Sequence, residues 1–340
     1  MRLMVTGGAG FIGSNFIRGF LARHPETQLI NVDLLTYAGN RDNMEGFTSY
    51  PGYVFVQADI NDREQLVKFF EQGLDGVINF AAESHVDRSI AEPHLFAQTN
   101  ILGTLNLLTL AREYEVPKFI QISTDEVYGT LGPTGQFTEE SPLAPNSPYA
   151  ASKAGADLLA RAFYITYGLP VVITRCSNNY GPYQFPEKLI PLVLINALKG
   201  EPVPLYGDGK QVRDWIHVAD HCRAVEMILQ QGKPGTVYNI GAENERTNLE
   251  VVRSILRILG KPESLIRFVA DRPGHDRRYA LAAGKIRREL GWEPEISFEQ
   301  GLAETVAWYV EHQAWWEKII SGEYQSYYQR FYLPRLEGKE

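Results

Sequence analysis

The stretch MVTGGAGFIGSNF, residues 4–16, decides the fold of this chain. It places Gly7, Gly10 and Gly13 between a short apolar run and an amphipathic stretch. When a strand turns through such glycines into a helix, the backbone can approach a pyrophosphate, and the first N–H groups of the helix point at its oxygens. Simple tight-turn glycines give the same local pattern, so the surrounding sequence has to decide between the two interpretations.

Short apolar runs alternate with amphipathic stretches around and after this loop. The runs are residues 3–6, 29–33, 53–57, 76–80, 118–122 and 171–174, and the amphipathic stretches are residues 11–23, 62–72, 93–115 and 148–167. Strands that are apolar on both faces and alternate with helices are typical of a parallel sheet covered by helices. We therefore predict an α/β fold: a Rossmann-type doubly wound parallel sheet with a smaller C-terminal substrate-binding lobe.

The alternation becomes less regular after about Cys176. Helices are expected near residues 189–199, 217–231, 247–259 and 297–313, and short strands at PVPLYG and TVYNIG. We predict that residues 1–176 form the dinucleotide-binding domain, which the chain re-enters around residues 210–240. Residues 177–330 would mainly form the lobe that closes over the sheet.

Composition excludes several classes of protein. The 340 residues are 44% hydrophobic, enough to bury a core, and the net charge of −8 without a long basic run argues against binding nucleic acid. Only Cys176 and Cys222 occur, far apart, which argues against a disulfide scaffold or a metal site and fits a reducing cytoplasm. No signal peptide or long apolar run is evident, so neither secretion nor a membrane partner is expected.

Asp33 ends the second predicted strand, about twenty residues after the glycine loop, as in dinucleotide-binding domains. A carboxylate there can accept hydrogen bonds from ribose hydroxyls and would repel the additional phosphate of NADP. NAD is therefore the expected cofactor. Arg41 is the contrary signal, because a guanidinium near the ribose can bind the additional phosphate of NADP. Asp59 follows the third strand and is expected near the adenine, although a helix N-cap explains it equally.

Tyr149 and Lys153 are four residues apart in SPYAASKAGAD, so they lie on one face of a predicted helix. An ammonium and the positive ring of NAD would stabilise a phenolate. Lowering the pKa of the phenol from ~10 toward 7 requires roughly 4 kcal/mol. Tyr149 is thus a candidate base, and Thr124 would hold the substrate hydroxyl or the tyrosine oxygen. A partly buried Tyr beside a solvated Lys is the structural alternative.

Several segments together resemble the extended short-chain dehydrogenase/reductase superfamily: TGGAGFIG, AAESHVDRS, STDEVYG, YAASKAGAD and RCSNNYGPYQFPEKLIP. Within it the chain resembles the dTDP-glucose 4,6-dehydratase family, from residue 1 to about residue 281. The resemblance implies an NAD-dependent lyase that converts dTDP-glucose to dTDP-4-keto-6-deoxyglucose by C4 oxidation, loss of water across C5–C6 and hydride return to C6. It also implies a homodimer formed by residues 93–115 and 148–167. Burial in the core of a single chain would explain the apolar faces of these helices as well.

The adjacent acids Asp125 and Glu126 are the most specific part of this resemblance. It implies that Tyr149 takes the proton of the 4-hydroxyl, that Glu126 removes the C5 proton, and that protonated Asp125 gives its proton to the departing 6-hydroxyl. Successive residues at a strand end point in different directions, and mutual repulsion keeps one acid protonated. A solvated acidic loop is the alternative.

The resemblance also implies binding residues. It places further cofactor contacts at Phe11, Ile12, Leu34, Thr36, Ile60, Ala81, Ala82, Ser84, Thr99 and Asn179, besides Tyr149 and Lys153. It places nucleotide-sugar contacts at Ser84, His85, Thr124, Asn178, Lys188, Leu189, Pro204, Leu205, Tyr206, Arg213 and Asn248. Arg272, beside His275, is a further candidate for the diphosphate, which an acidic protein must neutralise locally. His85 is expected to be a hydrogen-bonding core residue, with a catalytic acid as the alternative.

Three functions stay open on the sequence. The first is the dehydratase; the second is a UDP-sugar 4-epimerase or decarboxylase, which would have no use for the pair Asp125 and Glu126; the third is a redox-sensing regulator that binds NAD without turnover. The choice between thymine and uracil rests on one methyl group, worth about 1–3 kcal/mol in an apolar pocket. Residues 129–146 are expected to form a short lid over the sugar.

Overall fold

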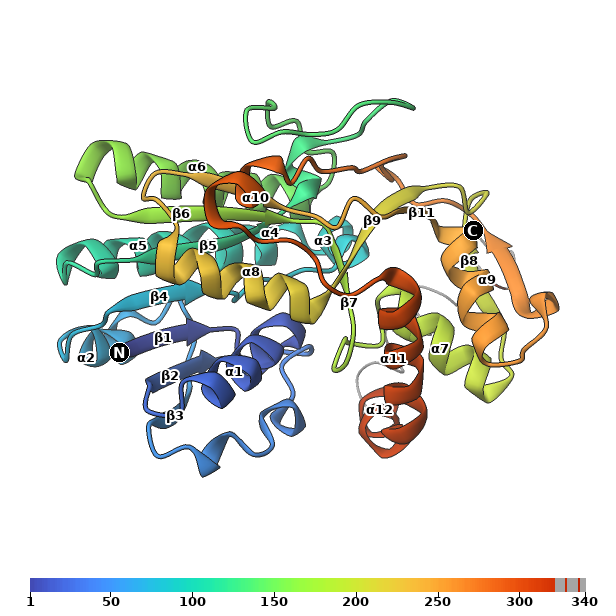
Figure 1. Cartoon of the computed structure of the whole chain (residues 1–340), viewed down its shortest axis with the longest axis horizontal. Helices are drawn as coiled ribbons and strands as arrows, with labels where there is room; N and C mark the ends of the chain where they lie inside the picture. The colour runs from blue at the N-terminus through green and yellow to red at the C-terminus, as the bar shows by residue number, and fades with distance from the viewer. Residues whose placement is uncertain (322–327, 329–335, 337–340) are drawn as a thin grey trace.

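A seven-stranded parallel sheet dominates the computed structural model, which describes residues 1–321, 328 and 336 (Figure 1). The strand order is β10-β6-β5-β4-β1-β2-β3, and every neighbouring pair is parallel. The strands are β1 (Arg2–Thr6), β2 (Gln28–Asp33), β3 (Tyr53–Gln57), β4 (Gly76–Asn79), β5 (Phe119–Thr124), β6 (Val171–Cys176) and β10 (Val237–Ile240). The predicted doubly wound sheet is confirmed.

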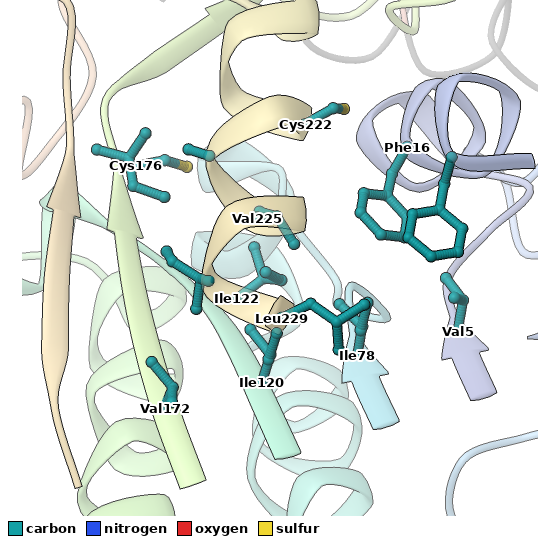
Figure 2. Close-up of a cluster of buried hydrophobic side chains, with 14 of the residues drawn as sticks. Val5, Phe16, Ile78, Ile120, Ile122, Val172, Cys176, Cys222, Val225 and Leu229 are labelled. Atoms are coloured by element: carbon teal, nitrogen blue, oxygen red, sulfur yellow. The ribbon is translucent and has the colours of Figure 1, made fainter. Parts of the chain in front are cut away.

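Helices cover both faces of this sheet because successive strand residues point to opposite sides. Leu3 and Val5 join the core under one group of helices: α1 (Phe11–Arg23), α8 (Val218–Gln231) and α10 (Gly284–Leu290). Met4, between them, joins the core under the other group: α2 (Arg63–Phe70), α5 (Thr104–Glu113) and α6 (Pro148–Tyr167). Figure 2 shows the first core, with Phe16 and Leu229 near Val5 and Ile78.

The helix predicted over residues 93–115 is not uniform. It consists of α4 (Pro93–Phe96), a π-helical segment η3 (Ala97–Gly103) and α5. Within η3 the buried Asn100 accepts the backbone N–H of Glu83 at 2.9 Å and donates to Ser152 Oγ at 2.8 Å. The wide turn therefore ties the loop after β4 to helix α6, and π-bulges commonly occur at functional sites.

A smaller lobe lies at the right of Figure 1 and has its own core, which includes Trp215, Val252 and Trp316. A three-stranded sheet has the order β11-β9-β7, and β12 pairs with β8. The elements are β7 (Asn178–Tyr180), α7 (Leu189–Lys199), β8 (Val203–Tyr206), β9 (Val212–His217), β11 (Glu245–Thr247), α9 (Asn248–Ile258), β12 (Ile266–Val269), α11 (Phe298–Glu311) and α12 (Gln313–Ile320).

The second half of the chain also contributes α8 and β10 to the large sheet layer. The division into residues 1–176 and 177–330 stays a prediction, and residues 322–327 and 329–330 of it lie outside the described residues. The remaining elements are α3 (Val86–Ala91) and the short helices η1 (Arg41–Met44), η2 (Phe47–Ser49), η4 (Asp125–Tyr128) and η5 (Glu263–Leu265).

The segment after η4 is held against the chain near residue 280. The N–H of Phe137 donates to the carbonyl of Ala280 at 2.8 Å, and the N–H of Leu131 donates to Arg278 at 3.0 Å. In the described part of the chain, no helix is long and apolar enough to cross a membrane. The same residues include no group of three His, Cys, Asp or Glu side chains placed to hold a metal ion.

Candidate active site

A cavity of about 300 Å³ lies at the carboxyl ends of β1, β2, β4, β5 and β6, where a doubly wound sheet binds its ligands. All predicted cofactor residues line it: Gly7, Gly10, Phe11, Ile12, Gly13, Asp33, Leu34, Thr36, Asp59, Ile60, Ala81, Ala82, Ser84, Thr99, Tyr149, Lys153 and Asn179. The predicted catalytic residues Thr124, Asp125 and Glu126 line the same cavity, as do Asn178 and Lys188. The structure thus brings these residues together, while their roles stay predictions.

The glycine loop can adopt its tight conformation only because it lacks side chains. A Cβ on Gly13 would lie 2.3 Å from the carbonyl oxygen of Gly7, and Gly7 itself has a φ of +71°. Gly10 is the N-cap of α1 and supplies no side-chain acceptor to the first turn. The first N–H groups of α1 therefore need another acceptor, and the phosphates of a dinucleotide fit that requirement.

The acids that follow β2 and β3 have separate local roles. Asp33 Oδ2 accepts the N–H of Ala9 at 2.9 Å and Oδ1 accepts that of Leu35 at 2.8 Å, so its carboxylate fixes the rim of the cavity. Burial raises the pKa of Asp33. Asp62, not Asp59, is the N-cap of α2. The N-cap alternative for Asp59 is therefore wrong, whereas a contact with adenine stays a prediction.

Arg41, the residue that would favour NADP, is engaged elsewhere. Its Nη2 donates to Gln57 Oε1 at 2.9 Å, and its guanidinium lies 5.5 Å from the centre of the Phe55 ring. These contacts leave Asp33 as the charged side chain on the cavity wall at the end of β2.

Asp125 and Glu126 lie in a 3₁₀ turn, η4, directly after β5. The prediction that they are strand-end residues is wrong in detail, because Thr124 ends β5 and is the N-cap of this turn. Thr124 Oγ1 accepts the N–H of Glu126 at 3.3 Å. With three residues per turn, neighbours point about 120° apart, so the two carboxyl groups still diverge.

The two carboxyl groups differ in their electrostatic surroundings. Burial raises the pKa of Asp125 well above its ordinary value, and the charge of Glu126 raises it further. Burial also raises the pKa of Glu126, but Arg272, Lys188 and Arg213 oppose this. Asp125 is therefore suited to hold a proton, and Glu126 is suited to be the carboxylate.

Tyr149 lies in the first turn of α6, whose N-cap Ser147 accepts the N–H of Ala150 at 3.1 Å. Burial, Glu126 and Cys176 raise the pKa of Tyr149 well above its ordinary value. The protein's own groups therefore oppose the lowered pKa that the sequence predicted, because the phenol is buried beside a carboxylate. Lys153 Nζ donates to the carbonyl of Ile122 at 2.6 Å, which fixes the ammonium beneath β5.

Basic side chains from the smaller lobe approach the catalytic turn. Lys188 is the N-cap of α7, and its Nζ donates to the carbonyl of Ser84 at 2.7 Å. Arg213 Nη2 donates to the carbonyl of Asp276 at 3.0 Å. Arg272 Nη1 lies 3.6 Å from Asp87 Oδ1. The smaller lobe thus places three cations, Lys188, Arg213 and Arg272, around the side chain of Glu126.

The other predicted nucleotide-sugar residues do not line the cofactor cavity: His85, Leu189, Pro204, Leu205, Tyr206, Arg213, Asn248, Arg272 and His275. Tyr206 donates to Asp87 Oδ2 at 2.9 Å, and His275 Nδ1 lies 2.5 Å from Asp271 Oδ1. Asn248 opens α9 with a buried Oδ1 that has no hydrogen-bond partner in the described part of the chain. Their contacts with a nucleotide stay predictions.

His85 has the surroundings of a neutral histidine. It is the N-cap of α3 and accepts the N–H of Arg88 at 3.4 Å. Burial lowers its pKa well below the ordinary value, and Lys188 and Arg272 lower it further. These surroundings favour the hydrogen-bonding role over a catalytic acid.

Sequence reasoning missed a buried cluster beside the cavity. Tyr37 donates to Glu187 Oε1 at 2.9 Å, and Arg88 Nε lies 3.5 Å from Glu187 Oε2. Burial raises the pKa of Glu187 to about 7. The sequence signal that could have revealed this cluster is Glu187, the acid directly before Lys188 in PEKLIP.

Comparison with known proteins agrees with this geometry. The family model described as "GDP-mannose 4,6 dehydratase" matches residues 4–305. A dTDP-glucose 4,6-dehydratase of Xanthomonas campestris is 53% identical over 95% of this chain and 97% of that protein, and one of Salmonella typhimurium is 49% identical over 98% and 100%.

Among solved structures too, a dTDP-glucose 4,6-dehydratase is more similar to this chain than an epimerase is. The dTDP-glucose 4,6-dehydratase of Streptomyces venezuelae, solved with NAD bound, has a TM-score of 0.92 at 53% identity and covers 94% of this chain and 100% of its own. A UDP-glucose 4-epimerase of Thermus thermophilus with NAD has a TM-score of 0.85 at 34% identity, over 92% and 100%. The chain belongs to the dTDP-glucose 4,6-dehydratase family.

Proposed function

We propose that this protein is an NAD-dependent lyase that converts dTDP-glucose to dTDP-4-keto-6-deoxyglucose. The observation that carries this assignment is the pair of carboxyl groups in η4: the buried Asp125 is suited to hold a proton, and the half-buried Glu126 is faced by cations. Relatives named for that activity match nearly the whole chain at about 50% sequence identity.

NAD, when bound, accepts the hydride from C4 of the sugar and later returns it to C6. Gly7, Gly10 and Gly13 would lie against its pyrophosphate, and Asp33 would accept hydrogen bonds from its ribose. The tight backbone around Gly13 supports this placement because a side chain there would collide with Gly7 and displace the loop.

The chain's own residues handle the protons. Tyr149 takes the proton of the 4-hydroxyl, and the resulting ketone makes the C5 proton acidic. Glu126 removes that proton, while Asp125 protonates the departing 6-hydroxyl, which leaves as water. Glu126 then returns its proton to C5 as the methyl group forms. Thr124, whose hydroxyl opposes the raised pKa of Tyr149, orients the base.

The nucleotide end would rest on the cations of the smaller lobe. Arg213 is buried and Arg272 is half-buried beside the catalytic turn, and both would be available to a diphosphate. The net charge of −8 makes such local cations necessary. A 4-epimerase would share the cofactor loop, Tyr149 and Lys153, but inversion at C4 would give the two carboxyl groups of η4 no task.

A single incubation tests the proposal. Purified protein is mixed with dTDP-glucose and NAD, and the mass of the sugar nucleotide and the alkaline absorbance of a 4-keto sugar are recorded. Loss of one water with the 4-keto absorbance is expected. An unchanged mass with inverted C4 would indicate an epimerase, and absence of turnover would indicate an NAD-binding regulator.

We also propose a cytoplasmic homodimer. Large apolar side chains are exposed on the outer face of α6 and beside it: Leu102 at 54%, Leu158 at 57%, Ile165 at 64% and Tyr167 at 51%. Leu158 and Ile165 are two helical turns apart on one face, as a helix-pairing surface requires. Sedimentation should give twice the chain mass, and L158E should give the monomer.

The reduced cysteines Cys176 and Cys222 fit the cytoplasm, which cell fractionation would test.

A further inference from the structure

Two structural elements share the proposed reaction. Helix α6 carries Tyr149 and Lys153, which act with NAD in the oxidation of C4, and η4 carries Asp125 and Glu126, which act in the loss of water. Both elements must meet one hexose, and a displacement of 1 Å between a catalytic group and its substrate can slow a reaction by about 100-fold. The position of η4 relative to α6 therefore has to be fixed. This requirement rests on the proposed function.

A buried ion pair ties α6 to the large sheet. Arg175 on β6 donates from Nε to Oδ2 of Asp157 on α6 at 2.8 Å, and the two residues are only 6% and 1% exposed. Val171 and Ile173 of β6 pack in the core beneath α6, and Arg175 is the next residue on that face of the strand. The pair therefore lies at the carboxyl end of β6, where Cys176 lines the cavity.

The other arm of the same guanidinium reaches η4. Arg175 Nη1 donates to the hydroxyl of Tyr128 at 2.9 Å, and the guanidinium carbon lies 4.8 Å from the centre of the Tyr128 ring. Tyr128 is the last residue of η4, two residues after Glu126. Its hydroxyl donates in turn to Asn239 Oδ1 at 2.7 Å, and because burial raises the pKa of Tyr128 to about 12, the donated proton stays in place. One guanidinium thus joins α6 to η4.

Asp157 is also one helical turn from Lys153. Positions 153 and 157 are neighbours on the surface of α6. Burial lowers the pKa of Lys153, and the charge of Asp157 opposes this. Burial raises the pKa of Asp157, and the charges of Arg175 and Lys153 oppose that. The carboxylate is therefore shared by two cations, one on the cavity wall and one behind it.

We propose that Asp157 and Arg175 are positioning residues that hold η4 against α6, with the hydroxyl of Tyr128 as the link. The lining of the cavity includes none of these three residues, so they act through the residues that do line it. Loss of the link should leave Tyr149 and Lys153 in place on α6 but loosen the turn that carries the two acids. Loss of water should therefore slow more than oxidation at C4.

The variant Y128F tests the link because it removes only the hydroxyl. The ring stays anchored by stacking on Phe137, whose centre lies 4.9 Å away. In the NAD-loaded protein, oxidation at C4 is followed in stopped flow by the absorbance of reduced nicotinamide, and loss of water is followed by rapid quench. Oxidation should keep the parent rate, whereas loss of water should slow by about 10-fold, the scale of a displacement smaller than 1 Å. Reduced nicotinamide should then accumulate before the product appears.

Y238F is the matched control. Tyr238 is buried on β10 next to Asn239, but its hydroxyl donates to Glu289 Oε2 at 3.1 Å, outside this network. Each variant loses one buried hydroxyl, so urea unfolding measures the general cost of that loss in both. Only Y128F should change the ratio of the two rates. A parent ratio in Y128F, with or without a loss of stability, would reduce the network to a structural role and overturn the proposal.

A double-mutant cycle tests the route through Arg175. R175K keeps a cation for Asp157 but has a single ammonium in place of the fork that also reaches Tyr128. It should slow loss of water as much as Y128F does, and the double variant should be no slower than either single variant, because each breaks the same link. Multiplied effects of about 100-fold in the double variant would show that the two residues act independently and would overturn the link.

The parent protein separates this proposal from the proposed function. If the parent forms no keto sugar from dTDP-glucose, the proposed function is contradicted. If the parent forms it and Y128F keeps the parent ratio of the two rates, only the positioning roles of Asp157 and Arg175 are contradicted.

Discussion

The two sides of the catalytic turn are built differently. The cofactor side, represented by Gly7, Gly13 and Asp33, is a close-fitting surface of backbone in which an added Cβ would collide with the chain. The nucleotide side, represented by the buried Arg213 and the half-buried Arg272, is a set of cations held by carbonyl and carboxylate oxygens. The first side selects its ligand by shape, whereas the second selects it by charge. Changes of volume should therefore damage one side and changes of charge the other.

The largest effect is expected where the two sides meet. D125N combined with E126Q removes the acid and the base but leaves Tyr149 and Lys153. Loss of water should slow by about 10⁴-fold, since each proton transfer contributes about 10² or more. Oxidation at C4 should stay partly intact, seen as reduced nicotinamide absorbance in a stopped-flow experiment. Dehydration at the parent rate would refute the roles assigned to the two carboxyl groups.

On the cofactor side, G13A should weaken NAD binding by about 3 to 4 kcal/mol. The methyl group would lie 2.3 Å from the carbonyl oxygen of Gly7, so overpacking strain adds to displacement of the helix N-terminus from the pyrophosphate. G19A in the same helix is the control, because its nearest neighbour is the flexible end of Arg23 at 3.3 Å. Calorimetric titration with NAD measures both variants, and equal affinities would show that the cradle does not hold the pyrophosphate.

The same contrast explains what the sequence could predict. The strands of the large sheet are apolar on both faces. Helix α6 has the N-cap Ser147 and ends at Gly168, and helix α7 ends at Gly200, so both helices were predicted at their observed bounds. The cofactor residues follow strand ends, and parallel strands end at one edge, which is why they all reach one cavity. Local pattern was sufficient for the glycine loop and Asp33, whereas the family resemblance supplied cofactor residues such as Ile60 and Thr99.

The smaller lobe and the charges needed long-range information. Strand β9, VRDWIH, mixes charged and apolar residues without alternating them, and it pairs with only three residues of β11 and three of β7. Its existence depends on partners far along the chain. Likewise no local pattern joins Asp87 to Tyr206 or Arg272. The raised pKa of Tyr149 follows from burial, which spacing alone does not reveal.

On the nucleotide side, R272Q should raise the KM for dTDP-glucose by about 100-fold while leaving NAD affinity unchanged. A buried guanidinium that hydrogen-bonds a phosphate contributes about 1.5–3 kcal/mol. R277Q is the control, since Arg277 forms an exposed ion pair with Asp208. Steady-state kinetics and calorimetry give the two quantities. A parallel loss of NAD binding in R272Q would show that the two sides are not independent.

The smallest effect concerns Glu187, which touches both halves through Tyr37 and Arg88. Burial raises its pKa to about 7 from 4.5, so the folded chain holds this proton more tightly than the unfolded chain does. Stability from this group is complete at low pH and is lost as pH rises through the folded-state pKa. Between about pH 5 and about pH 7 the loss amounts to about 2 kcal/mol. E187Q keeps an acceptor for Tyr37 but cannot titrate, so its free energy of unfolding in urea should fall less over this range. Parallel pH curves for the two proteins would show that Glu187 is ionised throughout, and charge would then extend from the nucleotide side to the rim of the cofactor cavity.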